Sequence, residues 1–320
     1  MPDGQHCYGV CDVDDLDALL NRCDKNQKRL KKWLKDQQLS AYRLYDRDMP
    51  EFPLAIDRYA DSLHVQVFER KRPVTDEQLD KLRDALLQHF QLEPLQLGFK
   101  TRKRQRGLDQ YEKLALDAPS FEVREYGLSF EVNLHRYLDT GLFLDHRQTR
   151  KMVREKSQSK SLLNLFAYTG SFTTYAAAGG ASRSLTVDMS KTYQAWSQRN
   201  LDINGLASAQ HQMLQTDVLA FLADPQQKLK FDLIVLDPPS FSNSKRMHNT
   251  FDVQRDQVDL LRNTLRFLAP GGQLIFSNNR QGFSLDERLL NEANFEEITE
   301  QTVPMDFARY RPHRCWKVTR

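Results

Sequence analysis

The chain has 320 residues, of which 40% are hydrophobic and 28% charged, with 46 Lys and Arg against 43 Asp and Glu. This composition excludes a disordered, collagen-like or low-complexity chain, and the length suffices for about two domains. The net charge of +3 argues against nucleic-acid binding through bulk positive charge, so any such binding must depend on local patches. No apolar run approaches the ~18–20 residues that span a bilayer, and a signal-peptide core is missing, so we expect a cytoplasmic protein.

The four cysteines are Cys7, Cys11, Cys23 and Cys315. Without a secretory signal, reduced thiols are the default and a disulfide framework is not expected. His6 and the first three cysteines could surround a zinc ion, but the C-x3-C pair lacks a second pair and Cys23 falls on the apolar face of a predicted helix. We therefore favour ordinary thiols and predict no metal.

Residues 1–40 predict an N-terminal segment with one amphipathic helix. Apolar residues recur at helical spacing between Asp14 and Leu39. Basic residues crowd positions 28–35 of the same helix, and a solvated helix face is the favoured interpretation of most of them.

Residues 41–136 predict a small α/β domain. Strand patterns at 55–59 and 63–68 are joined by an Ala-Asp-Ser turn, and Thr75 with Gln78 forms a capping box at the start of a helix. Further strand patterns follow at 97–100, 121–126 and 128–134. The most unusual stretch is basic and suited to phosphates, with a solvated loop as the alternative; its cations are Lys100, Arg102, Lys103, Arg104 and Arg106.

Residues 137–320 predict a doubly wound α/β domain, because largely apolar strands alternate with helices from about Ser161. Two further strand-like runs, at 295–303 and 315–319, follow without an intervening helix. They predict an antiparallel pair at one edge of a parallel sheet. The expected parallel strands lie at 162–166, 185–187, 210–215, 231–236 and 273–277.

Polar residues follow the first three of these strands, where such a sheet binds its ligands. The loop at 167–171 contains Gly170, which lets the backbone approach a ligand, but it lacks the G-x-G-x-x-G pattern of a dinucleotide site. Asp188 suits ribose hydroxyls and Asp217 suits the amine of an adenine. A helix N-cap is the alternative for each. Together they favour an adenosine-containing cofactor without a pyrophosphate.

The fourth strand ends in Asp237-Pro238-Pro239-Ser240-Phe241. Consecutive prolines lack N–H donors and hold a stiff, extended loop. Such a loop can present carbonyl groups and an aromatic ring to a planar base. A rigid turn in which Asp237 is a cap is the alternative.

These motifs, with Pro270-Gly271-Gly272 before the fifth strand, resemble those of class I S-adenosylmethionine-dependent methyltransferases. More narrowly, residues 137–147, 164–170, 237–246 and 276–279 resemble RlmK-type 23S rRNA methyltransferases, which methylate a guanine at N7. The resemblance covers roughly residues 25–320. It implies S-adenosylmethionine as cofactor, S-adenosylhomocysteine as product and no metal.

On this resemblance, residues 164–171 hold the methionine part of the cofactor and residues 137–147 close over it. Asp145 or Arg147 would lie near the amino acid moiety, although an Arg beside an Asp could equally form a structural ion pair at a domain junction. The implied cofactor-binding residues are Asp145, Arg147, Asn164, Phe166, Tyr168, Thr169, Gly170, Ser171, Asp188, Met189, Asp217, Val218 and Asp237.

The side chains near the expected site bear on which atom is methylated, cytosine C5 or guanine N7. Methylation at cytosine C5 needs a cysteine nucleophile, and neither the 237–242 loop nor the 277–279 stretch contains one. Guanine N7 has an in-plane lone pair and can attack the sulfonium methyl directly, so that catalysis is positioning. The expected catalytic residues are Asp237, Pro238, Pro239, Ser240, Phe241, Asn278 and Asn279. For Asn278 and Asn279, a polar turn after a strand is the alternative.

The expected partner is 23S rRNA or a precursor ribosomal particle, whose target base must be unstacked because guanine N7 lies in the inaccessible groove of A-form RNA. The expected RNA contacts add Lys245, Arg246 and Arg280 to the cluster at 100–106. The resemblance also implies an upstream methyltransferase domain, fused or separate. Alternatives are methylation of an exocyclic nitrogen and a non-catalytic RNA-binding protein with a vestigial cofactor pocket; a nicotinamide dehydrogenase is the weakest.

Overall fold

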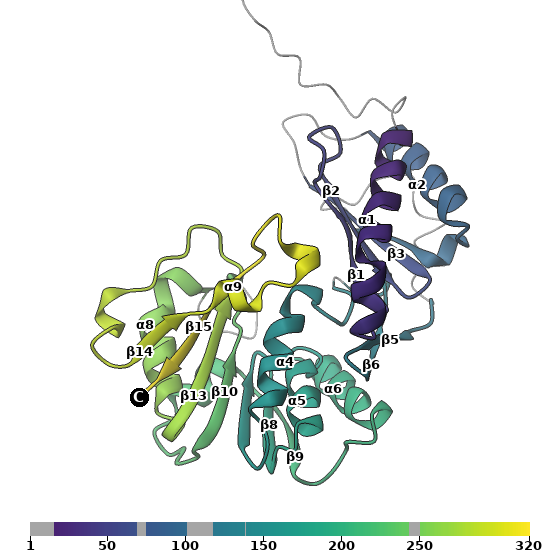
Figure 1. Cartoon of the computed structure of the whole chain (residues 1–320). Helices are drawn as coiled ribbons and strands as arrows, with labels where there is room; N and C mark the ends of the chain where they lie inside the picture. Colours follow the sequence, from purple (N-terminus) through teal and green to yellow (C-terminus); the bar gives the residue numbers. More distant parts are fainter. Residues whose placement is uncertain (1–15, 69–74, 101–117, 138, 243–249) are drawn as a thin grey trace, which may run out of the picture. The chain divides into compact units, whose positions relative to one another are not determined.

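The structure is a computed structural model that describes residues 16–68, 75–100, 118–137, 139–242 and 250–320 (Figure 1). The chain divides into two compact units. The first comprises Met1–Gly127 and Glu131–Thr140, and the second comprises Leu128–Phe130 and Gly141–Arg320. Among the described residues, no helix combines the length and apolar character that crossing a membrane requires.

The first unit contains a four-stranded sheet in the order β1-β2-β3-β4, in which only the β3–β4 pair is parallel. The strand β6 (Leu128–Val132) lies at the boundary, since its first three residues group with the second unit. The other elements of the first unit are α1 (Leu16–Asp36), β1 (Ala41–Asp46), β2 (Leu54–Tyr59), β3 (Ser62–Val67), α2 (Asp76–Phe90), η2 (Pro94–Gln96), β4 (Leu97–Lys100) and β5 (Phe121–Glu125).

Local sequence signals account for much of this unit. The capping box predicted at the start of α2 is confirmed, because the Thr75 side chain accepts from the backbone of Gln78 while the Gln78 side chain accepts from that of Thr75. The apolar stripe of α1, which includes Cys23, is buried in one core with the strands. Strand β1 was not singled out from the sequence.

The second unit contains a seven-stranded sheet in the order β14-β15-β13-β10-β7-β8-β9. Strands β13, β10, β7, β8 and β9 are parallel, whereas β15 runs antiparallel to both of its neighbours. The doubly wound fold with an antiparallel edge pair is therefore confirmed. The elements are η3 (Leu144–His146), α4 (Arg147–Glu155), β7 (Ser161–Leu165), α5 (Ser171–Ala178), β8 (Arg183–Asp188), α6 (Lys191–Ile203), β9 (His211–Gln215), α7 (Val218–Ala223), β10 (Phe231–Leu236), β11 (Phe241–Ser242), β12 (Phe251–Asp252), α8 (Val253–Leu265), β13 (Leu268–Asn278), η4 (Glu287–Leu289), β14 (Asn294–Glu297), α9 (Thr299–Thr302), η5 (Met305–Phe307) and β15 (Arg314–Thr319).

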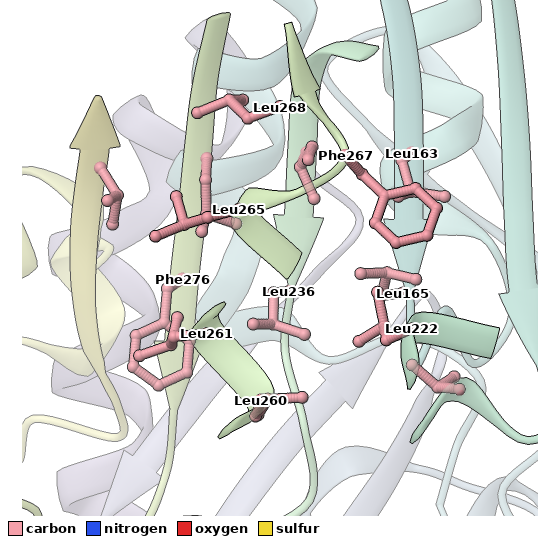
Figure 2. Packing of buried hydrophobic residues seen from close by; sticks show 14 of the residues in the cluster. Leu163, Leu165, Leu222, Leu236, Leu260, Leu261, Leu265, Phe267, Leu268 and Phe276 are labelled. Carbon is pink, nitrogen blue, oxygen red and sulfur yellow. The ribbon is translucent and has the colours of Figure 1, made fainter. Parts of the chain in front are cut away.

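Two packed cores cover the two faces of this sheet. Leu163 and Leu165 of β7 pack with α7, α8 and the alternate residues of β10, as Figure 2 shows. Leu162 of β7 belongs to a separate cluster with Val153 of α4 and Phe172 of α5. Because successive strand residues point to opposite faces, a nearly continuous apolar run is what a doubly covered strand requires.

The strand expected at 295–303 is wrong in its second half, since β14 ends at Glu297 and a helix turn follows. Ile298, Thr299 and Thr302 are buried, and this spacing matches a helix rather than a strand. The last parallel strand begins earlier than expected, because β13 already pairs at Leu268 and continues through the Pro-Gly-Gly stretch.

The order of the parallel strands reverses between β7 and β10, because β8 and β9 lie on one side of β7 while β10 and β13 lie on the other. In open α/β sheets, ligands bind beyond the carboxyl ends of the strands at such a reversal. The loops that follow β7 and β10 therefore mark the place where a site is expected.

Candidate active site

The loop after β7 has an unusual backbone. Phe166 has a φ of 54°, Tyr168 of 52° and Gly170 of 68°. Each non-glycine residue in this region costs about 1–3 kcal/mol, so the surrounding structure must hold it. Here the N–H of Ala167 donates to the carbonyl oxygen of Val187 at 3.2 Å, and the N–H of Tyr168 donates to Asp188 at 2.9 Å. The loop is thus held by the end of β8.

Packing against α6 explains the glycine in this loop. A Cβ at Gly170 would lie 2.6 Å from Oγ and 2.7 Å from Cβ of Ser197. The backbone at Gly170 therefore approaches the neighbouring helix α6 closely. That it also approaches a ligand stays a prediction.

The same loop is tied to the segment expected to close over the cofactor. The Tyr168 hydroxyl accepts from the N–H of Gly141 at 2.8 Å, and the Thr169 hydroxyl donates to the carbonyl oxygen of Gly141 at 2.6 Å. The ring of Phe143, which is 43% exposed, lies 5.0 Å from that of Tyr168. The structure thus brings residues 141–143 to the 166–170 loop and leaves an aromatic surface there.

The two strand-end carboxylates have different surroundings. Asp188 accepts from the N–H groups of Tyr168 and Ser190, at 2.9 and 2.8 Å, yet burial raises its pKa. Asp217 caps α7 by accepting from the N–H of Leu219 at 2.8 Å, which is one of the two roles expected for it. A carboxylate oxygen has more than one lone pair, so neither arrangement excludes a ligand hydrogen bond.

Other expected cofactor residues are interior or half-buried. Asn164 is 1% exposed and donates to the Thr173 hydroxyl at 3.1 Å, which lies 2.7 Å from the hydroxyl of Thr186. Val218 is buried, and Ser171 and Met189 are half-buried beside the strand ends. Sequence reasoning did not anticipate this polar network between β7, α5 and β8, because each member also fits an ordinary strand or helix position.

Arg147 is completely buried, and its Nη1 donates to both carboxylate oxygens of Asp306, at 2.8 and 3.1 Å. An ion pair was one of the two roles expected for this residue. Arg150, also buried, donates to the carbonyl oxygen of Phe143 at 2.8 Å.

The Asp-Pro-Pro loop after β10 is joined to the turn after β13. The Ser277 hydroxyl donates to Oδ1 of Asp237 at 2.7 Å, and the Ser240 hydroxyl donates to Oδ1 of Asn279 at 2.5 Å. Phe241 is 56% exposed beside them. The two stretches that were expected to hold the base are therefore brought together by side-chain hydrogen bonds.

Two other expected residues organise this turn. Asn278 is buried and accepts from the N–H of Arg280 at 3.2 Å. The Arg280 guanidinium forms an ion pair with Asp252, so part of its charge is already balanced within the second unit.

A buried pair of histidines lies behind Asp237. Nε2 of His146 is 3.3 Å from Oδ2 of Asp237 and 3.8 Å from Oδ2 of Asp145. Nδ1 of His313 is 3.1 Å from the same oxygen of Asp145, and the two imidazole rings stack at 4.3 Å. Sequence reasoning quoted the segment that contains His146 without assigning it a role, and it did not single out His313. The adjacent residues Asp145 and His146, within the segment expected to close over the cofactor, were the available signal in the sequence.

Asp145, His146 and His313 each offer one atom that could bind a metal ion, and these atoms lie within 4.8 Å of one another. The two ring planes, however, are inclined by only 14°. A histidine binds a metal through a lone pair in the plane of its ring, and two nearly parallel stacked planes meet far from either ring. The trio therefore fits hydrogen bonding rather than coordination.

Several predictions fall outside the described residues. They concern the side chain of Lys100 and residues Arg102, Lys103, Arg104, Arg106, Lys245 and Arg246, together with His6, Cys7 and Cys11. The two described cysteines, Cys23 and Cys315, are buried, and burial raises the pKa of both thiols. Such buried thiols are inert as nucleophiles.

Known proteins resemble this chain in both sequence and fold. A family model described as S-adenosylmethionine-dependent methyltransferase matches residues 45–305. The chain is 45% identical over 311 residues to ribosomal RNA large subunit methyltransferase K of Neisseria meningitidis, covering 96% of this chain and 88% of that protein. It is also 45% identical over 306 residues to ribosomal RNA large subunit methyltransferase K/L of Vibrio cholerae, covering 93% of this chain.

The chain spans only 43% of the length of that K/L relative. Among solved structures, SMU.776, a methyltransferase crystallised with SAH, superposes with a TM-score of 0.72 at 23% identity, covering 93% of this chain and 80% of that one. This likeness supports the fold. The family match and the relative from Neisseria meningitidis lead to one conclusion: the chain belongs to the S-adenosylmethionine-dependent methyltransferases, in the family of ribosomal RNA large subunit methyltransferase K.

Proposed function

We propose that the chain transfers a methyl group from S-adenosylmethionine to N7 of a guanine in 23S ribosomal RNA. The observation that carries this proposal is the hydrogen-bonded junction of the Asp237–Ser240 loop with the Ser277–Asn279 turn, beside the reversal in strand order. This junction gathers hydrogen-bonding side chains and the exposed ring of Phe241 at one end of the sheet. The relatives named for ribosomal RNA methylation support the class of substrate.

The proposed chemistry needs no proton transfer. Guanine N7 carries a lone pair and no hydrogen, so it attacks the sulfonium methyl in line; the N7–C bond forms as the S–C bond breaks, and S-adenosylhomocysteine leaves. The protein then contributes positioning. The cofactor would lie against the 166–170 loop, with its ribose at Asp188 and its adenine at Asp217, where each carboxylate oxygen can accept a further hydrogen bond.

The test is incubation of the full chain with labelled S-adenosylmethionine and undermodified 23S rRNA. N7-methylguanosine is cationic, and reduction followed by aniline treatment cuts the RNA at that position. Cleavage at a single guanosine is the expected result. Label that enters RNA without such cleavage would contradict the N7 assignment.

A second candidate is methylation of an exocyclic amine, because the side chain of Asp237 is 26% exposed and a carboxylate can accept from such an amine. Digestion of the labelled RNA to nucleosides separates the two products. A non-catalytic RNA-binding protein is the third reading, and calorimetric titration with S-adenosylmethionine tests it, since the absence of binding would favour it.

We further propose that the chain grips RNA mainly through the basic cluster at 100–106, and that residues 1–40, 41–136 and 137–320 act as helix, RNA-binding domain and catalytic domain. Substituting the arginines at 102–106 should lower RNA affinity and leave cofactor affinity unchanged. Each lost phosphate contact should reduce the salt slope of RNA binding by roughly 0.7. An unchanged RNA affinity would contradict this assignment.

A further inference from the structure

The hydroxyl of Thr302 begins a line of polar groups that ends at Asp237. It donates to the carbonyl oxygen of Thr299 at 2.9 Å, so its oxygen faces Nε2 of His313, 3.1 Å away, as an acceptor. His313 therefore places its Nε2–H on Thr302 and turns Nδ1 towards Asp145, at 3.1 Å. One proton must lie between His313 Nδ1 and Asp145, since otherwise two lone pairs would face each other.

His146 stacks on His313 and is the next member of the line. Burial lowers its pKa, so the ring is neutral at neutral pH and carries one proton. Its Nε2 faces the oxygens of Asp237 and Asp145, and only an N–H is favourable against two acceptors. The proton is therefore on Nε2. The other nitrogen, Nδ1, is buried and has no hydrogen-bond partner among the described residues.

An unsatisfied buried acceptor destabilises a fold, so a purely structural role would favour an apolar residue at this position. Three contacts hold the ring: Asp237 and Asp145 at Nε2, the stacked ring of His313, and the ring of Phe172, whose centroid lies 5.8 Å away at an interplanar angle of 62°. The positive charge of the buried Arg150 also lowers the pKa of His146. The fixed ring of His146 thus helps to hold the carboxylate of Asp237 in place.

We propose that His146, held by Asp145 and His313, is a positioning residue that aims the Asp237 carboxylate at the Watson–Crick edge of the target guanine. The proposal rests on the proposed function of this site. A carboxylate only accepts hydrogen bonds, and the N7/O6 edge of guanine also only accepts, so Asp237 cannot bind that edge. It can accept from N1–H and the N2 amine on the opposite edge, which leaves N7 free for the methyl group.

Two features of Asp237 and one of Asn279 fit this role. Ser277 donates to Oδ1 and His146 faces Oδ2, so both oxygens are held from within the protein. The side chain nevertheless stays 26% exposed. Asn279 accepts from Ser240 through Oδ1, which turns its amide N–H₂ donor away from Ser240 and makes it available for guanine O6.

The experiment compares methyl transfer to two synthetic RNA fragments that carry the mapped target as guanosine or as inosine, which lacks the N2 amine. For the wild type, kcat/KM should be at least about 10-fold higher with guanosine, because one charge-assisted hydrogen bond is lost with inosine. His146→Asn should lower kcat with guanosine about 10-fold to 100-fold, the range seen when a supporting residue is removed. It should also shrink the guanosine-to-inosine ratio towards 1.

His211→Asn is the matched control, because this half-buried histidine bonds a hydroxyl, that of Ser184, at the opposite edge of the sheet. It should change neither rate nor ratio. If His146→Asn lowers both rates equally, its role is structural and the proposal is overturned. If the wild type does not methylate guanosine, the proposed function fails, and the guanine part of this inference fails with it.

A measurement without RNA tests the contact between His146 and Asp237 independently of the proposed function. The ring nitrogens of His146 should show the neutral Nε2–H form by NMR, and Asp237→Asn should shift the Nε2 resonance. An unperturbed resonance would overturn the contact itself, whatever the substrate is.

Discussion

Two carboxylates at opposite edges of the seven-stranded sheet have pKa values shifted in opposite directions. At the amino edge, Asp232 of β10 accepts from both the backbone and the hydroxyl of Ser161, at 2.8 and 2.7 Å, and these bonds lower its pKa. At the carboxyl edge, Asp188 also accepts two backbone hydrogen bonds, yet burial outweighs them and raises its pKa. The surroundings of Asp232 thus stabilise its charged form, while the surroundings of Asp188 destabilise it.

Histidines show the same contrast. Burial lowers the pKa of both His211, at the start of β9, and His146. Nδ1 of His211 has the Ser184 hydroxyl at 2.9 Å, whereas Nδ1 of His146 has no partner among the residues that the structure describes. Burial alone therefore does not distinguish the edges. The missing partner of His146 Nδ1 does distinguish these two histidines, and His146 lies at the edge where a ligand is expected.

The largest effect is expected for Arg147→Met at the carboxyl edge. It removes the buried guanidinium that pairs with the buried Asp306 carboxylate, which should lower the free energy of unfolding by about 3–5 kcal/mol. Urea denaturation measures this. The double variant Arg147→Met/Asp306→Leu removes both charges and should recover much of the loss. Equal losses in the single and double variants would contradict a dominant charge effect.

Gly170→Ala comes next, because it combines a positive φ with a contact of 2.6 Å to Ser197. The sum should cost about 2–4 kcal/mol. Gly205→Ala is the matched control, since Gly205 has a φ of +66° and nothing within 4 Å of an added Cβ, so it should cost only about 1 kcal/mol. Equal costs would show that packing on α6 does not require the glycine.

Asp232→Asn tests the amino edge and should cost about 1–2 kcal/mol at pH 7 through weakened bonds to Ser161. The folded-state pKa of Asp232 lies below the ordinary value of 3.8. Its stabilisation is therefore complete above that value and is lost as the pH falls through the folded-state pKa. Chemical denaturation at several pH values should show the variant approaching the wild type in acid. A constant difference would contradict the role of the charge.

The smallest effect is expected for Asp188→Asn, below about 1 kcal/mol at pH 7, because relief of a buried charge offsets weakened hydrogen bonds. The folded-state pKa is above 3.8, so the wild-type carboxyl destabilises the fold as the pH rises through the interval between the two values. This slope is opposite to that of Asp232. A large loss of stability at pH 7 would mean that the edges do not differ as described.

Much of the candidate site could be read from local patterns. Asp188, Asp217 and Asp237 could be placed at strand ends because apolar runs mark the strands and the chain alternates strand with helix. The capping box at Thr75 depends on residues three apart and was equally visible. The helix turn at 299–302 was missed because its buried threonines are weak signals of either structure.

The sequence by itself determined the order of the five parallel strands along the chain, and with it the edge at which the aspartates that follow three of them gather, whereas α4 and the β11–β12 pair were not predicted. Only the tertiary structure decided that His146 and His313, which begin and end that unit, stack on each other behind Asp237. The physical reason is that periodicity records which face of an element is buried, whereas the pairing of buried polar groups depends on contacts between elements far apart in the chain. Those contacts also decided that Gly170 packs on a helix and that Arg147 neutralises Asp306.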